Sequence, residues 1–218
     1  DGHNCLVYSS LGDGNADAAI DAELAYFRGL MRSFEWKLYS HDEPGDLKAR
    51  LAARGFSIGE DEAIMALDLA ELPAELSAPR PVEARRVTDE EGLAAYAALD
   101  ALTWPADHEP YMRELARNFR EEPGRQSLWL AYIDGTPACA ARIDFPPRSP
   151  FASLWGGATL EAYRERGAYT ALLAARAKEA IARGYRFLTI DASPMSRPIV
   201  ARRGFRLLSI SNPCDSPD

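Results

Sequence analysis

The sequence predicts a mixed α/β fold of the α+β type, in which helices flank a central mixed sheet. Segments in which apolar and polar residues alternate are interspersed with segments whose apolar residues recur every three or four positions. Two alternating runs flank Asp134-Gly135, a pair favoured in tight hairpin turns, and predict antiparallel strands over residues 127–145. A strand, a long helix and another strand then follow over residues 151–193, an alternation typical of α/β architectures.

The first 72 residues predict a small unit of strands and helices. Strands are expected over residues 5–11, 34–40 and 63–72, where apolar residues alternate or form short runs. A short helix is expected to begin after Asp46, a capping residue, and to end at Gly55. An earlier, longer helix has one apolar face, which holds Ile20, Leu24, Phe27 and Met31.

Residues 73–81 are rich in proline and alanine, and we interpret them as a linker. A strand over residues 82–87 follows, and Thr88 with Glu91 forms a capping box for the next helix. The apolar face of a second helix holds Met112, Leu115, Ala116 and Phe119. The sequence therefore predicts three parts, namely residues 1–72, the linker and a C-terminal domain over residues 82–218.

The remaining elements follow the predicted hairpin. A strand over residues 151–160 contains a glycine pair, which indicates a bulge or the close approach of another group. A helix begins at about Gly167, and its apolar face holds Leu172, Leu173, Ala177, Ala180 and Ile181. A strand over residues 185–193, a short helix over 196–204 and a strand over 205–211 end the pattern.

Charge and cysteine content limit the classes of function. The chain of 218 residues has a net charge of −8 and a pI near 5.0, which argues against a nucleic-acid binder. Its three cysteines, Cys5, Cys139 and Cys214, lie far apart, so we expect neither a metal site nor a disulfide framework. Because no apolar run approaches the length of a membrane span, we expect a cytoplasmic protein without a membrane partner.

The two ends of the chain share an order of elements. A strand, a long helix, a strand, a short helix, a Gly-Phe pair and a further strand occur around Gly55-Phe56 and again around Gly204-Phe205. The turn into the long helix is basic in the second copy (YRERGAY) and acidic in the first (LGDGNAD). Only the second turn is therefore expected to attract an anion. The alternative is a coincidence of common α/β elements.

The second turn has the chemistry of a phosphate site. A helix N-terminus carries unpaired backbone N–H groups and partial positive charge, and a glycine lets a phosphate come close to them. Arg164 and Arg166 add charged donors. Glycine turns before helices are common, so the turn taken alone favours a capped surface helix over a phosphate site.

The stretch from residue 151 onwards resembles the core of the GCN5-related N-acetyltransferase (GNAT) superfamily. The family signature is Arg/Gln-x-x-Gly-x-Gly/Ala at a strand-to-helix turn, and Arg164 and Gly167 match it. The Gly204-Phe205 pair matches the Gly-Phe that usually follows the short fourth helix of the family. The resemblance extends over about residues 82–211, and through the repeat the N-terminal part resembles a degenerate half of the same fold, as in tandem acetyltransferases.

The resemblance implies that acetyl-CoA is the co-substrate and that an acetyl group passes to an amine of a small molecule or peptide. Backbone amides and side chains expected to bind the pyrophosphate belong to Arg164, Arg166, Gly167, Ala168, Tyr169 and Thr170. The acyl-pantetheine arm is expected to pair with Ala158, Thr159 and Leu160, where a backbone amide would polarise the thioester carbonyl. A neutral amine would attack directly, so a base or a water relay has to remove a proton.

Three positions depart from the family pattern. Tyr169 replaces the last small residue of the signature, and we expect its ring to pack inward while its N–H faces the phosphates. Ser193 stands where an asparagine usually ends the fifth strand. Val200 stands where a tyrosine often protonates the CoA thiolate, and valine cannot donate a proton.

Candidate catalytic residues are therefore few. Ser193 and Tyr163 are candidate proton donors, and Glu161, Asp144 and Asp191 are candidate bases, although each carboxylate also fits a solvated or capping role. A non-catalytic acyl-CoA-binding or interaction module is the alternative to an enzyme, and the replacement at Val200 favours it. A third reading is a fold that binds nothing. A homodimer is compatible with all three.

Overall fold

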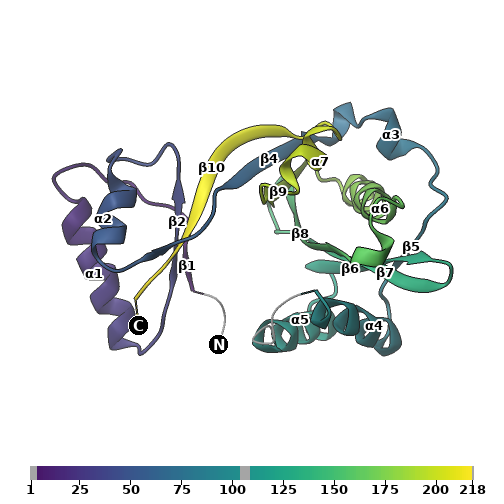
Figure 1. Cartoon of the computed structure of the whole chain (residues 1–218), viewed down its shortest axis with the longest axis horizontal. Coiled ribbons are helices and arrows are strands. Elements are labelled where there is room, and N and C mark those ends of the chain that lie inside the picture. Colours follow the sequence, from purple (N-terminus) through teal and green to yellow (C-terminus); the bar gives the residue numbers. More distant parts are fainter. Residues whose placement is uncertain (1–3, 104–108, 218) are drawn as a thin grey trace. The chain divides into compact units, whose positions relative to one another are not determined.

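The computed structural model describes residues 4–103 and 109–217, which form two compact units (Figure 1). The N-terminal unit consists of residues 4–65, 192–199 and 207–217. The C-terminal unit consists of the described residues within 66–191 and 200–206. By their contacts the units are thus interleaved along the chain, whereas the sequence analysis places one linker between them. The assignment of the first 72 residues as a degenerate half-domain stays a prediction.

The N-terminal unit combines short strands with two helices. Their bounds are β1 (Cys5–Leu6), α1 (Ala16–Gly29), β2 (Glu35–Tyr39), α2 (Leu47–Ala53), β3 (Ser57–Ile58) and β10 (Arg206–Asp215). Strand β2 pairs with β1 in parallel and with β10 antiparallel, and β3 also pairs antiparallel with β10. Ile20 of α1, Leu51 of α2 and Trp36 of β2 meet in one buried cluster. The two helices therefore share one core with the sheet.

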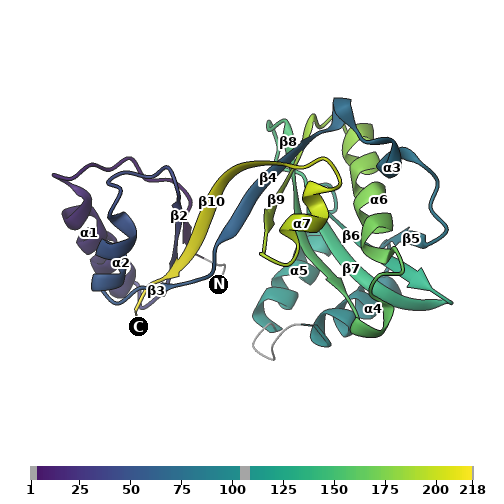
Figure 2. The same cartoon turned by 45° about the horizontal axis from the view of Figure 1, so that its top comes forward.

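The C-terminal unit is a mixed sheet with helices on both faces (Figures 1 and 2). Its strands are β5 (Glu83–Arg86), β6 (Gln126–Ile133), β7 (Thr136–Asp144), β8 (Phe151–Thr159) and β9 (Phe187–Ala192). Neighbours from β5 to β8 pair antiparallel, and β9 joins β8 in parallel. The predicted central mixed sheet with flanking helices is confirmed. The chain also includes β4 (Glu62–Asp68), the 3-10 turn η1 (Leu69–Glu71) and α7 (Arg197–Ala201).

Helices α4 (Glu90–Ala101) and α5 (Glu109–Glu121) cover one face of this sheet, and α6 (Ala168–Ala182) covers the other. Tyr96 of α4 and Leu115 of α5 pack with Leu128 and Leu130 of β6. On the opposite face, Ala168 and Leu172 of α6 pack against a second cluster, formed by Ala131, Ile133, Ala138, Cys139 and Ala141. Cys139 is fully buried in this second cluster.

Several sequence-based details differ in the structure. Met31 is 93% exposed, because α1 ends at Gly29 and the apolar face stops before it. Helix α4 is capped by Asp89, whose carboxylate accepts from the Gly92 N–H at 2.8 Å, so the predicted cap at Thr88 is one residue early. The predicted linker contains a short helix, α3 (Ala74–Ser77), which packs against α6 through the buried Leu76.

Candidate active site

Strand β8 contains a bulge at its glycine pair. Ala140 of β7 pairs with Ala158, and Arg142 pairs with Trp155. Gly156 and Gly157 therefore oppose Ala141 alone, which is the arrangement of a β-bulge. Gly156 has a φ of 58°, a left-handed conformation that favours glycine. The bulge predicted from the glycine pair is thus present, and it bends the strand just before its end.

The same strand has an open edge beyond the bulge. Pairing between β8 and β9 runs from Phe151–Phe187 to Leu154–Ile190, and within the described residues β8 continues to Thr159 without a β9 partner. The Leu160 N–H donates to the Ala138 carbonyl of β7 at 3.0 Å. Because successive backbone N–H groups of a strand point to opposite edges, the Thr159 N–H points to the open edge. This edge can accept an extended ligand as an added strand.

A strained turn follows β8. The 3-10 turn η3 (Glu161–Tyr163) leads to Glu165 and Gly167, which both have positive φ, 64° and 85°. Helix α6 begins directly afterwards at Ala168, and no side chain caps its N-terminus. Its first backbone hydrogen bond runs from the Ala171 N–H to the Gly167 carbonyl at 2.9 Å. The N–H groups of the first helical turn are therefore left for an external acceptor.

Two arginines border this turn, and they differ in their partners. Arg166 forms an exposed ion pair with Asp134 at 2.8 Å, which ties the turn to the β6–β7 hairpin. The Arg164 side chain is exposed and makes no hydrogen bond or ion pair within the described residues. Thr170 is buried, and its hydroxyl accepts from Arg203 at 3.3 Å, so its own hydrogen is still available for donation. Arg164 is thus the arginine of this turn that has no counter-ion within the described residues.

The Tyr169 ring packs inward, as predicted. It lies against the buried cluster beneath α6, and its Cε2 atom would be only 2.8 Å from a Cβ atom at Gly157. Burial raises the pKa of the Tyr169 phenol, so it stays protonated near neutral pH. Since the ring occupies the sheet side of the helix, the first-turn N–H groups are not covered by a side-chain cap.

Comparison with known proteins identifies the family. The model of the acetyltransferase (GNAT) family matches residues 94–205, just over half of the chain. The chain belongs to the GNAT family. This membership supports acetyl transfer as its general activity, and the matched segment contains the bulge, the turn and α6. No curated protein matches the sequence.

Solved structures agree with the GNAT fold over nearly the whole chain. A GCN5-related N-acetyltransferase from Kribbella flavida is 19% identical with a TM-score of 0.73, covering 98% of this chain and 80% of its own. A functionally unknown protein from Staphylococcus epidermidis is 15% identical with a TM-score of 0.73 (96% and 82% covered). A tandem GNAT protein from the clavulanic acid pathway is 18% identical with a TM-score of 0.66 (100% and 77% covered). At these identities the likeness concerns the fold alone.

The predicted catalytic residues of this GNAT chain are not gathered at the bulge. Glu161 is an exposed carboxylate at the start of η3. Ser193 belongs to the N-terminal unit, where its hydroxyl shares a hydrogen bond with that of Ser196 at 3.2 Å. Tyr163 is half-buried, with the Arg166 guanidinium 5.8 Å from its ring centre. Val200 is fully buried, so no proton donor replaces it at that position. Trp104, Asp107 and His108 follow the first helix of the C-terminal domain, in a predicted loop that often lines the acceptor site in the family, and they lie outside the described residues.

Sequence reasoning missed two buried polar residues at the bulge. Tyr96 of α4 and Arg176 of α6 are each 1% exposed. Neither residue stands out as a site residue by its position in the pattern, because Tyr96 lies on the apolar stripe of its helix and Arg176 among the alanines of α6. A signal was available only for Arg176, since a charged residue on the buried face of a helix is uncommon.

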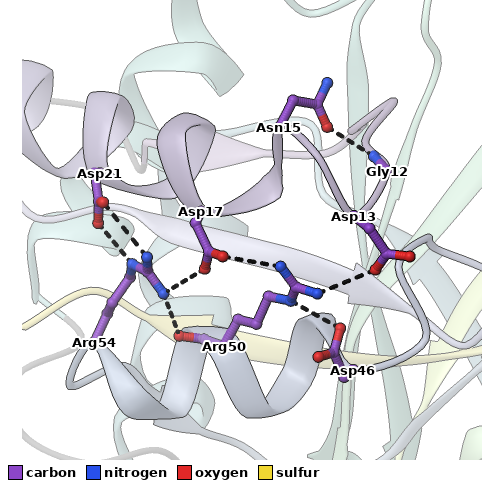
Figure 3. A network of polar contacts seen from close by, with 8 residues as sticks. All are labelled: Gly12, Asp13, Asn15, Asp17, Asp21, Asp46, Arg50 and Arg54. Carbon is purple, nitrogen blue, oxygen red and sulfur yellow. Dashed lines mark hydrogen bonds and ion pairs between the residues drawn. The ribbon is translucent and has the colours of Figure 1, made fainter.

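The acidic turn of the N-terminal unit is held by ion pairs (Figure 3), while α1, like α6, has no side-chain hydrogen bond at its N-cap. Arg50 of α2 contacts Asp13, Asp17 and Asp46 at 2.8–3.1 Å. Arg54 contacts Asp17 at 2.9 Å and Asp21 at 2.6 Å. Carboxylates therefore neutralise both arginines beside the N-terminus of α1. This supports the prediction that only the second turn attracts an anion. Within the described residues, no helix is long and apolar enough to cross a membrane, and no group of three or more acidic, histidine or cysteine residues could hold a metal ion.

Proposed function

We propose that this GNAT protein is an acetyl-CoA-dependent N-acetyltransferase that acts on an amine of a small molecule or peptide. One observation carries the proposal: an uncapped α6 N-terminus follows a strand whose edge is open. The turn can bind a diphosphate while the edge pairs with an extended chain that carries amide groups. Acetyl-CoA combines these two features, with its pyrophosphate at one end of an amide-containing pantetheine arm.

The pyrophosphate is held chiefly by backbone groups. Gly167 and the first-turn residues Ala168, Tyr169 and Thr170 present N–H groups at the positive end of the helix dipole. Arg164 adds a guanidinium without a counter-ion, and the Thr170 hydroxyl adds a further donor. Arg166 can join them once it leaves its exposed partner, Asp134, a pairing of low energy.

The thioester is held along β8. The pantetheine arm runs from the turn back along the open edge beside Ala158, Thr159 and Leu160, where the Thr159 N–H is free to donate. Backbone amides on this edge polarise the thioester carbonyl. The neutral amine attacks the carbonyl carbon, its proton passes to a base or water, and the CoA thiolate leaves. A thiolate is a fair leaving group even without an acid, because a free thiol has a pKa of about 8.5.

The turn is tested by comparing Gly167→Glu with Gly167→Gln. Both variants carry the same strain at a φ of 85°, but only glutamate repels phosphate. A Cβ at this position would meet Val82 no closer than 3.8 Å, so the change does not disturb the core. By calorimetric titration we expect Gly167→Glu to weaken acetyl-CoA binding at least about tenfold more than Gly167→Gln. Equal affinity in wild type and both variants would place the phosphates elsewhere.

A non-catalytic acyl-CoA-binding module is the second candidate, and the buried Val200 favours it. Release of CoA thiol over a panel of amines separates the two functions. Binding without turnover would support the module, and absence of binding at millimolar acetyl-CoA would contradict both. The tandem origin of the N-terminal unit, a homodimer and a cytoplasmic location remain predictions from the resemblance and the composition.

A further inference from the structure

The Tyr96 side chain is buried, and its hydroxyl has no hydrogen-bond partner among the described residues. The residue is 1% exposed. A Cβ atom at Gly156 would lie 3.4 Å from this oxygen, so the hydroxyl faces the backbone of the β8 bulge. Phenylalanine would fill the same space without the cost of an unsatisfied hydroxyl. Packing alone therefore does not explain why this residue is a tyrosine.

Arg176 provides a second observation at the same bulge. Its Nε donates to the Leu172 carbonyl at 3.1 Å, and its Nη1 donates to the Arg142 carbonyl of β7 at 2.9 Å. Its Nη2 is buried without a partner. The groups that act electrostatically on this guanidinium are Tyr169, Cys139 and Tyr96, none of which is a carboxylate. A buried cation without a counter-ion favours the development of negative charge nearby.

The direction of the pantetheine arm connects these groups to the reaction. Phosphates at the α6 N-terminus place the start of the arm beside Leu160, and the arm runs back along the open edge of β8. Five residues, 155–159, make up the stretch without a β9 partner, about 16 Å of extended chain. The acyl end of the arm therefore arrives at the bulge, where the Tyr96 hydroxyl faces Gly156.

We propose that Tyr96 is a catalytic residue whose hydroxyl donates a hydrogen bond to the acetyl carbonyl oxygen, with Arg176 as a positioning residue that favours the negative charge on that oxygen. The proposal rests on the proposed acetyl-CoA function. As the amine attacks, the C–N bond forms and the carbonyl electrons move to the oxygen, which Tyr96 and the backbone amides stabilise together. When the C–S bond breaks, the carbonyl re-forms and the tyrosine is unchanged. Burial raises the pKa of Tyr96, which keeps this donor protonated at all working pH values.

The test compares Tyr96→Phe with Tyr185→Phe. The Tyr185 hydroxyl donates to the Pro146 carbonyl at 3.0 Å, so its loss is expected to lower the melting temperature without altering catalysis. Tyr96→Phe is expected to leave the melting temperature unchanged or raised, because no hydrogen bond is lost. It should lower the rate of CoA release about 100-fold. In calorimetry, wild type should bind acetyl-CoA about fivefold more tightly than CoA, and Tyr96→Phe should lose that preference while its affinity for CoA is kept.

The binding measurement requires no amine acceptor, so it tests the proposal even if no acceptor that supports turnover is found. Arg176→Gln, if folded by circular dichroism, should reduce the same preference for acetyl-CoA over CoA. If neither nucleotide binds, the proposed function and this inference both fall. If both bind and Tyr96→Phe changes neither the preference nor the rate of CoA release, the inference alone falls.

Discussion

At the scale of single residues, Gly157 leaves the space that the Tyr169 ring occupies. The family signature has a small residue where this chain has Tyr169, and the ring needs space on the sheet. Gly157 supplies it, because a Cβ there would lie 2.8 Å from the ring. The departure in the helix is thus matched by a glycine in the strand. Gly156 faces the Tyr96 hydroxyl, so each glycine of the bulge packs against the side chain of one tyrosine.

This pairing predicts strong coupling between the two positions. Gly157→Ala alone should destabilise the fold by about 1–3 kcal/mol, the usual cost of overpacking. In a Tyr169→Ala background the same change should cost little, because the clashing ring is gone. Urea unfolding of the four proteins of the double-mutant cycle measures the coupling. Gly156→Ala in the same background serves as the control. It should remain destabilising, because an alanine is strained at a φ of 58° whether or not the Tyr169 ring is present. Additive effects of Gly157→Ala and Tyr169→Ala would contradict the pairing.

At the scale of elements, the long helices of the predicted repeat, α1 and α6, follow turns of opposite charge. The arginine that precedes the helix-ending glycine faces the first turns of the long helix in both copies. In the N-terminal unit Arg54 meets two aspartates of α1, whereas in the C-terminal unit Arg203 meets the Thr170 hydroxyl and Glu75. Helix α1, like α6, has no side-chain cap, so the two N-termini differ in the aspartates that surround the first and not in their capping.

The ion pairs of the N-terminal unit should stabilise the packing of α1 on α2. Arg54→Met leaves Asp17 and Asp21 without this partner, so we expect a lower melting temperature at low salt. At about 1 M salt the difference should shrink, because the charges are exposed and screened. Arg28→Met is the matched control, since Arg28 is an exposed α1 residue without an ion pair in the described part of the chain. An equal effect of both changes would show that the Arg54 contacts contribute nothing specific.

At the scale of the whole molecule, paired carboxylates make stability depend on pH. Hydrogen bonds from Arg186 lower the pKa of Asp68 from 3.8 to about 2. Arginine partners also lower the pKa of Asp21, Glu83 and Glu90. Because the folded state holds these protons less tightly than the unfolded state, their contribution is present above pH 3.8 for the aspartates and above pH 4.5 for the glutamates. It is lost as pH falls through the lowered pKa values, and for Asp68 that value is about 2. Asp144 acts in the opposite direction, since burial raises its pKa.

We therefore expect the free energy of unfolding to fall as pH is lowered through this window. Urea unfolding from about pH 6 down to pH 2 measures the slope. The Asp68→Asn variant should lose less free energy of unfolding than wild type over the same range, because asparagine does not titrate. A free energy that stays level to pH 2 would contradict the prediction.

Local patterns in the sequence determined most of the elements and the location of the turn. The hairpin at Asp134-Gly135, the glycine bulge and the start of α6 near Gly167 each depend on a few neighbouring residues, and each appears as predicted. The cap at Thr88 and the apolar position of Met31 were wrong. Which of two adjacent residues caps a helix, and at which residue a helix ends, depends on the packing of the folded chain.

Only the tertiary structure decided which groups meet at the bulge. Tyr96 and Arg176 lie on helices on opposite faces of the sheet, so no spacing along the chain relates them to Gly156. The burial of both residues, and the unpaired Nη2 of Arg176, become visible only when every neighbouring donor and acceptor is in place. The sequence by itself determined the glycine turn before α6 because a helix N-terminus is a local structure. The chemistry beside it depends on contacts across the sheet, which arise only when the chain folds.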